Sequence, residues 1–211
     1  MEVTTSVSVI IVLFAISTLR KLEASLVPIK HTWTYELKSV EAHSDNPDLW
    51  SFNEFKVERI SRGVYAASIS FTVNFDIVEG DDTEIEFLSY RSENGVKEYK
   101  PIPFKVQRQH LFKYFDNLYK LIMGTLKECS NMPVFEDKFE PPFEKKTYVL
   151  DKCQFDQSEF PQHIQDGFYK VIVNGYGAAT WNMVFIVEII RKKMAILILL
   201  AQNVQCGPVI W

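Results

Sequence analysis

The chain has 211 residues, of which 47% are hydrophobic and 24% are charged, a composition typical of one folded domain with a sizeable core. Its formal net charge is −4, and removal of the first 24 residues leaves that charge unchanged. The last 21 residues carry three bases and no acid, so residues 25–190 carry −7. An acidic body repels nucleic acid, and we therefore expect no nucleic-acid partner.

The N-terminus carries an apolar leader. Residues 7–16 contain only Ser8 as a polar interruption, which is the length of a signal-peptide core and too short to span a bilayer. The alternative is a buried N-terminal helix, favoured by Glu2 in place of a base and by the lack of a clean cleavage pattern near Ala24. The leader predicts an extracellular, secreted protein. The predicted organisation is a signal peptide, one domain and a divergent tail, at residues 1–24, 25–190 and 191–211.

The tail contains a second apolar run. Residues 194–201 are apolar and follow a basic triplet, Arg191-Lys192-Lys193. Eight residues are too few to cross a bilayer as a helix, so we predict no membrane span.

Alternation of apolar and polar side chains predicts strands along most of the first half of the chain. Residues 33–38 and 54–58 show this pattern, and the clearest case is 65–77, whose odd-numbered residues are all apolar or aromatic. The turn sequence Gly80-Asp81-Asp82 follows, and then alternation resumes at 84–87. We therefore predict that 65–77 and 84–87 pair as antiparallel neighbours.

Further strands are predicted beyond this point. Asn94-Gly95 is a strong hairpin signal, and the strand that follows at 99–104 contains two prolines, which is typical of an edge or irregular strand. The same alternation predicts three more strands, at 148–150, 168–173 and 181–189.

One segment has helical rather than strand periodicity. Its apolar residues recur every three or four positions and predict one amphipathic helix from about 110 to 127. We expect its apolar face to pack against a sheet; a membrane or a partner surface is the alternative. The residues that define the face are Leu111, Phe115, Leu118, Ile122 and Leu126.

These elements predict a mainly β protein, an immunoglobulin-like antiparallel β-sandwich or cup with one inserted helix. The chain contains 16 Phe, 9 Tyr and 4 Trp, and many of them fall on inward-facing strand positions. Two sheets this rich in aromatic residues either pack shut or stay apart and hold an apolar ligand. Composition does not distinguish these outcomes.

Three cysteines allow at most one internal disulfide bond. Cys129 and Cys153 are the natural pair because both lie in the well-patterned part of the chain, which leaves Cys206 over. The bond would close a loop of 25 residues and stabilise the fold by about 3 to 4 kcal/mol. Two reduced, buried cysteines in a cytosolic protein are the alternative.

No catalytic or metal-binding motif occurs in the sequence. Gly-x-Ser-x-Gly, a glycine-rich phosphate loop and His-Glu-x-x-His are all absent. Cys-x-x-Cys and His-x-x-x-His spacings are absent too, and the four histidines are scattered. We therefore predict a protein that is not an enzyme and that uses no cofactor and no metal.

Seven short stretches, taken in their order and spacing, resemble one family. They are residues 57–65, Tyr90-Arg91-Ser92, 99–104, Cys129-Ser130-Asn131-Met132-Pro133, 138–142, 148–153 and 167–171. Together they resemble the insect chemosensory protein A (CheA) group, which is related to the CheB proteins and more remotely to the ganglioside-activator-like ML lipid-recognition proteins.

The resemblance implies a secreted β-sandwich or cup that holds a lipid or a long-chain hydrocarbon, used in chemosensation or pheromone detection. It implies the disulfide bond between Cys129 and Cys153, and a chemosensory receptor or channel as a further partner. Two alternatives stay open: an extracellular protein-interaction module that docks through its helix or residues 135–143, and a lipid-presenting cofactor for a hydrolase.

Strand and helix faces indicate which side chains would line a ligand pocket. The predicted wall consists of aromatic residues that point inward from the strands and the helix. They are Phe71, Phe75, Phe87, Phe115, Trp181 and Phe185.

Overall fold

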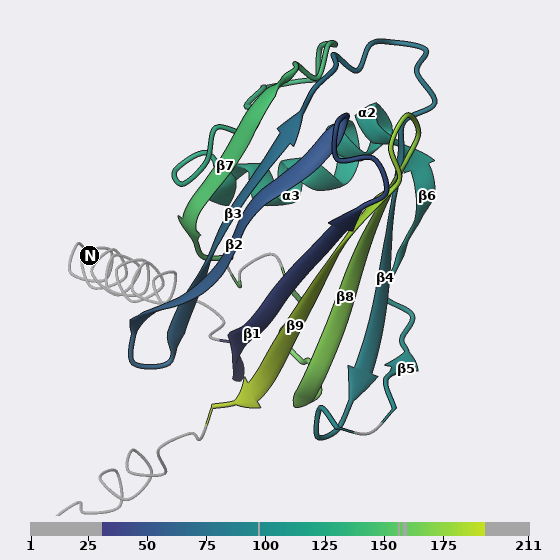
Figure 1. Cartoon of the computed structure of the whole chain (residues 1–211). Coiled ribbons are helices and arrows are strands. Elements are labelled where there is room, and N and C mark those ends of the chain that lie inside the picture. Colours follow the sequence, from purple (N-terminus) through teal and green to yellow (C-terminus); the bar gives the residue numbers. More distant parts are fainter. Residues whose placement is uncertain (1–30, 97, 156, 158–159, 193–211) are drawn as a thin grey trace, which may run out of the picture. The chain divides into compact units, whose positions relative to one another are not determined.

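Two antiparallel sheets face each other in the described part of the chain (Figure 1). The structure is a computed structural model that describes residues 31–96, 98–155, 157 and 160–192. The chain divides into two compact units, Met1–His31 and Thr32–Trp211, and every element below belongs to the second. The predicted signal peptide and residues 193–211 of the predicted tail lie outside the described residues.

The larger sheet has six strands. Its order is β1-β9-β8-β4-β5, and β6 also pairs with β4. The strands are β1 (Trp33–Ser44), β4 (Glu84–Ser92), β5 (Lys100–Pro101), β6 (Val106–His110), β8 (Gly167–Tyr176) and β9 (Trp181–Arg191). β5 is the short, proline-containing edge strand that the sequence predicts, whereas β6 was not predicted.

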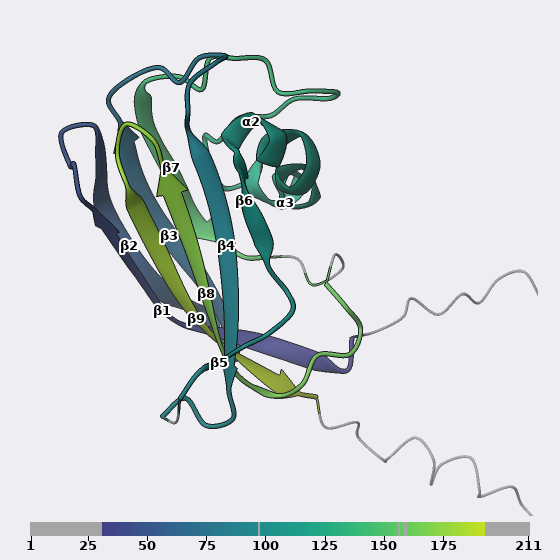
Figure 2. The ribbon, with the colours of Figure 1, turned by 90° about the vertical axis from the view of Figure 1, so that its right-hand side faces the viewer.

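The smaller sheet has three strands, in the order β2-β3-β7. They are β2 (Trp50–Ser61), β3 (Val64–Val73) and β7 (Lys146–Cys153). Figure 2 shows the two sheets as layers, with the helical segment beside them at one end. This arrangement confirms the predicted mainly β sandwich with one inserted helix.

The predicted pairing of 65–77 with 84–87 is wrong. β3 ends at Val73 and pairs with β2 and β7, while β4 belongs to the other sheet. The chain crosses between the sheets in the intervening segment, where Ile77 forms a β-bridge with Phe143 (N···O 3.0 and 2.9 Å). Alternation shows that a strand has a buried face, but it does not show in which sheet that face is buried.

A column of stacked aromatic rings fills the core. Successive ring centroids lie 4.4 to 5.4 Å apart, and no successive pair is tilted by more than 19°. The column runs across β7, β3 and β2 to β9 through Phe143, Tyr148, Phe71, Trp50 and Trp181. Stacked rings of this kind contribute beyond their buried area, so the column is a principal link between the two sheets.

The last ring of the column packs directly on the backbone of β8. A Cβ atom added at Gly175 would lie 2.0 Å from the indole ring of Trp181, which is closer than any real contact. Glycine at this position is therefore what allows Trp181 to reach Trp50.

Replacing Gly175 by alanine should destabilise the fold by about 2 to 3 kcal/mol, because the new methyl group displaces Trp181 from the column. Gly124 is a matched control, since it lies in a helix and a Cβ atom added there would meet nothing within 4 Å. Gly124→Ala should be neutral or stabilising by up to about 1 kcal/mol. Urea unfolding measures both, and equal effects would contradict this role of Gly175.

The predicted helix is present as one continuous segment. It consists of α2 (Leu111–Tyr114), a π-helical turn η1 (Phe115–Tyr119) and α3 (Lys120–Leu126). His110 caps its start, because its Nδ1 accepts a hydrogen bond from the main-chain N–H of Phe112 (3.2 Å). The buried face packs within the protein, with Tyr114 5.2 Å from Phe87 of β4 and Phe115 5.4 Å from Phe143.

Burial raises the pKa of Tyr114, Tyr119 and Tyr148 above the ordinary value of 10. In the folded protein these phenols therefore stay neutral at a pH at which they ionise in the unfolded chain. Their contribution to stability is complete below about pH 10 and is lost as the pH rises further. The free energy of unfolding should fall above about pH 10, and phenolate absorbance should show the three tyrosines ionising only with unfolding. Normal titration of all tyrosines in the folded state would contradict this.

Candidate functional site

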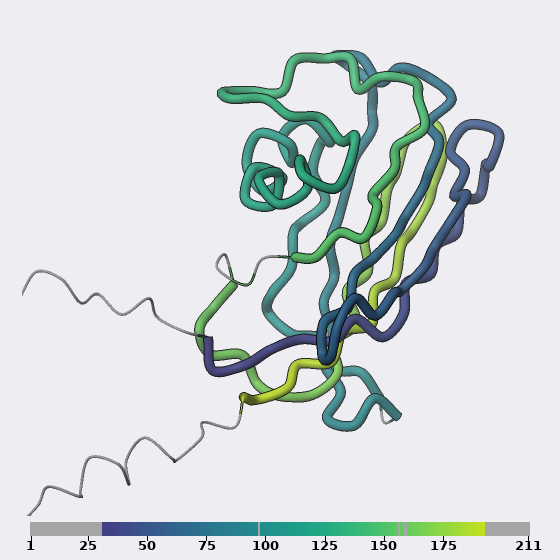
Figure 3. The backbone as a smooth tube through the Cα atoms, turned by 90° about the vertical axis from the view of Figure 1, so that its left-hand side faces the viewer, coloured from purple at the N-terminus to yellow at the C-terminus, as the bar shows by residue number. Residues whose placement is uncertain are grey.

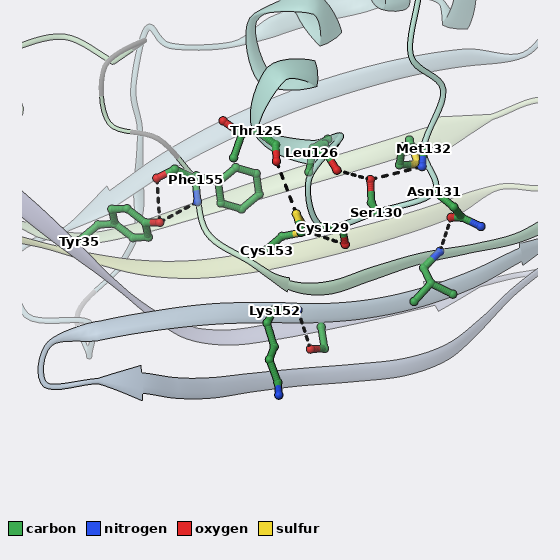
Figure 4. The surroundings of a disulfide bond; sticks show 12 residues. Tyr35, Thr125, Leu126, Cys129, Ser130, Asn131, Met132, Lys152, Cys153 and Phe155 are labelled. Atoms are coloured by element: carbon green, nitrogen blue, oxygen red, sulfur yellow. Dashed lines mark hydrogen bonds between the residues drawn. A yellow bond between two sulfur atoms is a disulfide. The ribbon is translucent and has the colours of Figure 1, made fainter.

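The disulfide bond predicted between Cys129 and Cys153 is present (Figure 4). Cys129 follows the end of α3, and Cys153 is the last residue of β7. Cys153 is 1% exposed and pairs with Ala67 of β3. The bond therefore attaches the end of the helix to the smaller sheet.

Hydrogen bonds hold the residues after Cys129 in the same place. Ser130 Oγ donates to the carbonyl of Leu126 (2.7 Å), which closes the turn at the end of the helix. Asn131 Oδ1 accepts from the main-chain N–H of Val149 (2.8 Å), and Asn131 Nδ2 donates to the carbonyl of Thr147 (2.9 Å). Because the helix begins directly after β6 of the larger sheet and the disulfide bond attaches its end to β7, it connects the two sheets.

Breaking the bond with Cys153→Ser should lower the free energy of unfolding by about 3 to 4 kcal/mol, because the unfolded chain regains the entropy of the closed loop. The double variant Cys129→Ser/Cys153→Ser is the control for the unpaired thiol and should lose the same amount. Urea unfolding under non-reducing conditions measures both. A loss below about 1 kcal/mol would contradict a stabilising role.

The connection between β7 and β8 is fastened to β1. Tyr35 Oη donates to the carbonyl of Phe155 (3.0 Å) and accepts from its N–H (2.9 Å), as Figure 4 shows. Trp33 Nε1 donates to the carbonyl of Pro161 (3.0 Å). The tube in Figure 3 shows the described part of this connection passing near the start of β1, where these hydrogen bonds hold it.

The inner face of the larger sheet is buried at its two ends and half-buried between them, since Trp181 at one end and Ile189 at the other are 6% and 8% exposed. Trp181 lies on this inner face. Because the register of β8 and β9 has no shift, every second residue of each strand lies on the same face as Trp181. Val173 and Trp181 are buried, but the next pairs along the strands, Val171 with Phe185 and Tyr169 with Val187, are only half-buried. These two pairs are therefore partly open to solvent between the buried ends, although Phe185 and Val187 also pack against the core.

We call this region the inner apolar surface. Its members are half-buried side chains on the facing sides of the two sheets, and all of them except Val171 also pack against the buried core. They are Phe87, Val171, Met183, Phe185 and Val187 of the larger sheet, with Val57 and Tyr65 of the smaller sheet.

The six predicted pocket residues divide between this surface and the core. Phe87 and Phe185 belong to the inner apolar surface. Phe71, Phe115 and Trp181 are 7%, 2% and 6% exposed and lie among packed rings. The sixth, Phe75, is half-buried beyond the end of β3. Contact of any of them with a ligand stays a prediction.

Sequence reasoning missed the aliphatic part of the surface and its polar end. Val171 and Val187 fall on the alternating pattern of predicted strands, so their inward orientation could have been read from the sequence. Their partial exposure could not, because it depends on how far apart the sheets lie.

The inner apolar surface ends at a polar pair. Arg91 of β4 lies opposite Tyr169 of β8 and shares its face of the sheet. Arg91 Nη2 donates to the carbonyl of Asp166 (2.6 Å), and Tyr169 Oη donates to the carbonyl of Gln165 (2.7 Å). Burial raises the pKa of Tyr169, although the charge and hydrogen bond of Arg91 oppose that rise.

A separate depression lies on the outer face of the larger sheet. It has a volume of about 430 Å³ and is open to solvent. Lys170 Nζ lies 4.5 Å from the centre of the Tyr99 ring within it. Its lining residues are Tyr90, Val96, Glu98, Tyr99, Lys170 and Ile172.

The described residues hold neither a metal-binding cluster nor a membrane-spanning helix. Nowhere among them do three or more His, Cys, Asp or Glu side chains gather in a way that suits a metal ion. Within the same residues, no helix has the length and apolar character needed to cross a membrane.

One known family is similar to part of this chain. The family described as "Protein of unknown function (DUF1091)" matches residues 85–171, which is less than half of the chain. The matched segment runs from β4 through the helix and the disulfide bond into β8. It therefore contains Phe87, Arg91 and Val171. No curated protein matches the chain.

Proposed function

We propose that this protein is a secreted, non-enzymatic binding protein for a lipid or another long-chain hydrophobic molecule, which lies on the inner apolar surface. One observation carries the proposal. The register pairs Val171 with Phe185 and Tyr169 with Val187 sit on the two central strands of the larger sheet, yet they are only half-buried. The partial exposure of these side chains, between two buried ends of the inner face, supports a site for an apolar ligand there.

The energetics of apolar burial favour such a ligand. Transfer of a methylene group from water to an apolar surface contributes about 0.8 kcal/mol, so a long chain gains several kcal/mol against the cost of immobilisation. The helix, the disulfide bond and the aromatic column hold the two sheets in place. A surface held in this way is largely formed before the ligand arrives, which lowers the cost of binding.

Secretion and the biological setting rest on other grounds. A disulfide bond is typical of an oxidising compartment, which supports export. The resemblance to the CheA group, and through it to ML lipid-recognition proteins, supports a hydrophobic ligand. A role in chemosensation or pheromone detection, with a receptor or channel as partner, rests on that resemblance alone.

Adjacent residues of β8 provide a matched test. Val171 and Ile172 are both half-buried and β-branched, but their side chains point to opposite faces of the sheet. Val171→Trp should weaken binding of a fluorescent hydrophobic probe about tenfold or more, because the indole occupies the inner apolar surface. Ile172→Trp should change the Kd for the probe by less than about twofold. Fluorescence titration of purified, folded variants measures both.

Native mass spectrometry of protein secreted from its own host provides an independent readout. A co-purified lipid is expected for the unmodified protein and for Ile172→Trp, and its loss is expected for Val171→Trp. Absence of probe binding together with absence of any co-purified lipid would overturn the proposal. Loss of binding in Ile172→Trp alone would move the site to the outer depression.

A protein-docking module is the second candidate. Exposed apolar side chains on the helix and on the segment after it favour this function, since Leu121 is 54% exposed and Val134 is 61% exposed. A module of this kind would bind a protein partner through these side chains and would bind neither the probe nor a lipid.

A further inference from the structure

A cation lies where the inner apolar surface ends. Arg91, Tyr169 and Val187 form one row across β4, β8 and β9, directly next to the row that contains Val171 and Phe185. The strand register is regular along both pairings, so all five residues are on the inner face of the sheet. The row therefore places a guanidinium group at one end of an apolar strip.

Arg91 has no carboxylate partner among the described residues. Its Nη2 donates to a main-chain carbonyl, that of Asp166, and its buried Nε has no hydrogen-bond acceptor. The nearby carboxylate of Asp166 is paired instead with Arg191 (3.3 Å). Among the described residues, Arg91 therefore has no ion pair, and it lies in a partly buried position.

Arg59 and Lys120 also donate to main-chain carbonyls and have no ion pair among the described residues, but only Arg91 has a buried nitrogen without an acceptor. Five other cations form ion pairs within 3.3 Å. They are Lys38, Lys56, Arg108, Lys146 and Arg191. A guanidinium group that is partly removed from water without an anion is costly, so an anionic group at this position would be favoured.

We propose that the bound molecule is an amphiphile with a single anionic carboxylate head, of the long-chain fatty-acid class. Its apolar chain lies along the inner apolar surface, and its carboxylate is held by Arg91. This inference rests on the proposed function and adds the chemical class of the ligand. An uncharged hydrocarbon or alcohol would gain the apolar contacts but not the charge-assisted hydrogen bonds.

The test compares two ligands that differ only in the head group. Dodecanoate and dodecanol compete against a bound fluorescent hydrophobic probe at neutral pH. The unmodified protein should bind dodecanoate about tenfold or more tightly than dodecanol, and Arg91→Gln should abolish that preference by weakening dodecanoate alone. Arg91→Lys, which keeps the charge without the planar fork, should retain part of the preference.

Lys170→Gln is the matched control. Lys170 belongs to the neighbouring row but faces the outer side of the sheet, so its removal changes the net charge equally. The Kd values of Lys170→Gln for dodecanoate and for dodecanol should both stay within about twofold of those of the unmodified protein. Thermal unfolding confirms that each variant is folded.

The outcomes separate this inference from the proposed function. Equal binding of both ligands by the unmodified protein, or an equal loss of both in Arg91→Gln, would overturn the carboxylate assignment and leave the apolar site in place. Binding of neither ligand by the unmodified protein would overturn the proposed function itself. If Arg91→Gln does not fold, the head-group preference of the unmodified protein and of Arg91→Lys decides the question.

Discussion

The aromatic column is the interaction on which the arrangement of the sheets depends. Its rings come from both sheets, and Trp50 of β2 stacks on Phe71 of its own sheet at 5.4 Å and on Trp181 of the other at 4.7 Å. Stacking sets a short, well-defined distance between the sheets where the column passes. This packing leaves one hydrogen-bond donor unsatisfied, since the buried Nε1 of Trp50 has no acceptor within the described residues. The packing gain of the column outweighs that orphaned donor.

The middle of the inner face is less buried than either of its ends. The helix and the disulfide bond join the sheets beside the column, and the hydrogen bonds of Tyr35 and Trp33 hold the connection between β7 and β8 against the start of β1. Val171 and Phe185 lie between these contacts and stay half-buried. The same features that stabilise the fold therefore define where an apolar ligand has room to bind, and Arg91 defines the chemical character of its end.

Sequence patterns predicted elements better than they predicted neighbours. The helix near 110–127, the edge character of the strand with two prolines and the pairing of Cys129 with Cys153 are all confirmed. The predicted hairpin of 65–77 with 84–87 is wrong because the turn sequence between them is compatible with a crossing between sheets. Among the predicted pocket residues, Phe71 and Phe185 have the same inward pattern, yet one lies in the column and the other on the inner apolar surface.

By itself, the sequence determined the periodicities, and with them the helix, most of the strands and the inward or outward orientation of most strand residues, whereas β6 was not predicted. It also determined which cysteines were available to pair. Only the tertiary structure decided which strands share a sheet, where the sheets touch and where they stay apart. The physical reason is that alternation reflects the two faces of one strand, whereas closure depends on ring stacking between residues distant in the chain, such as Trp50 and Trp181. The lack of an ion pair at Arg91 among the described residues depends in the same way on distant contacts, because the carboxylate of Asp166 pairs with Arg191 instead.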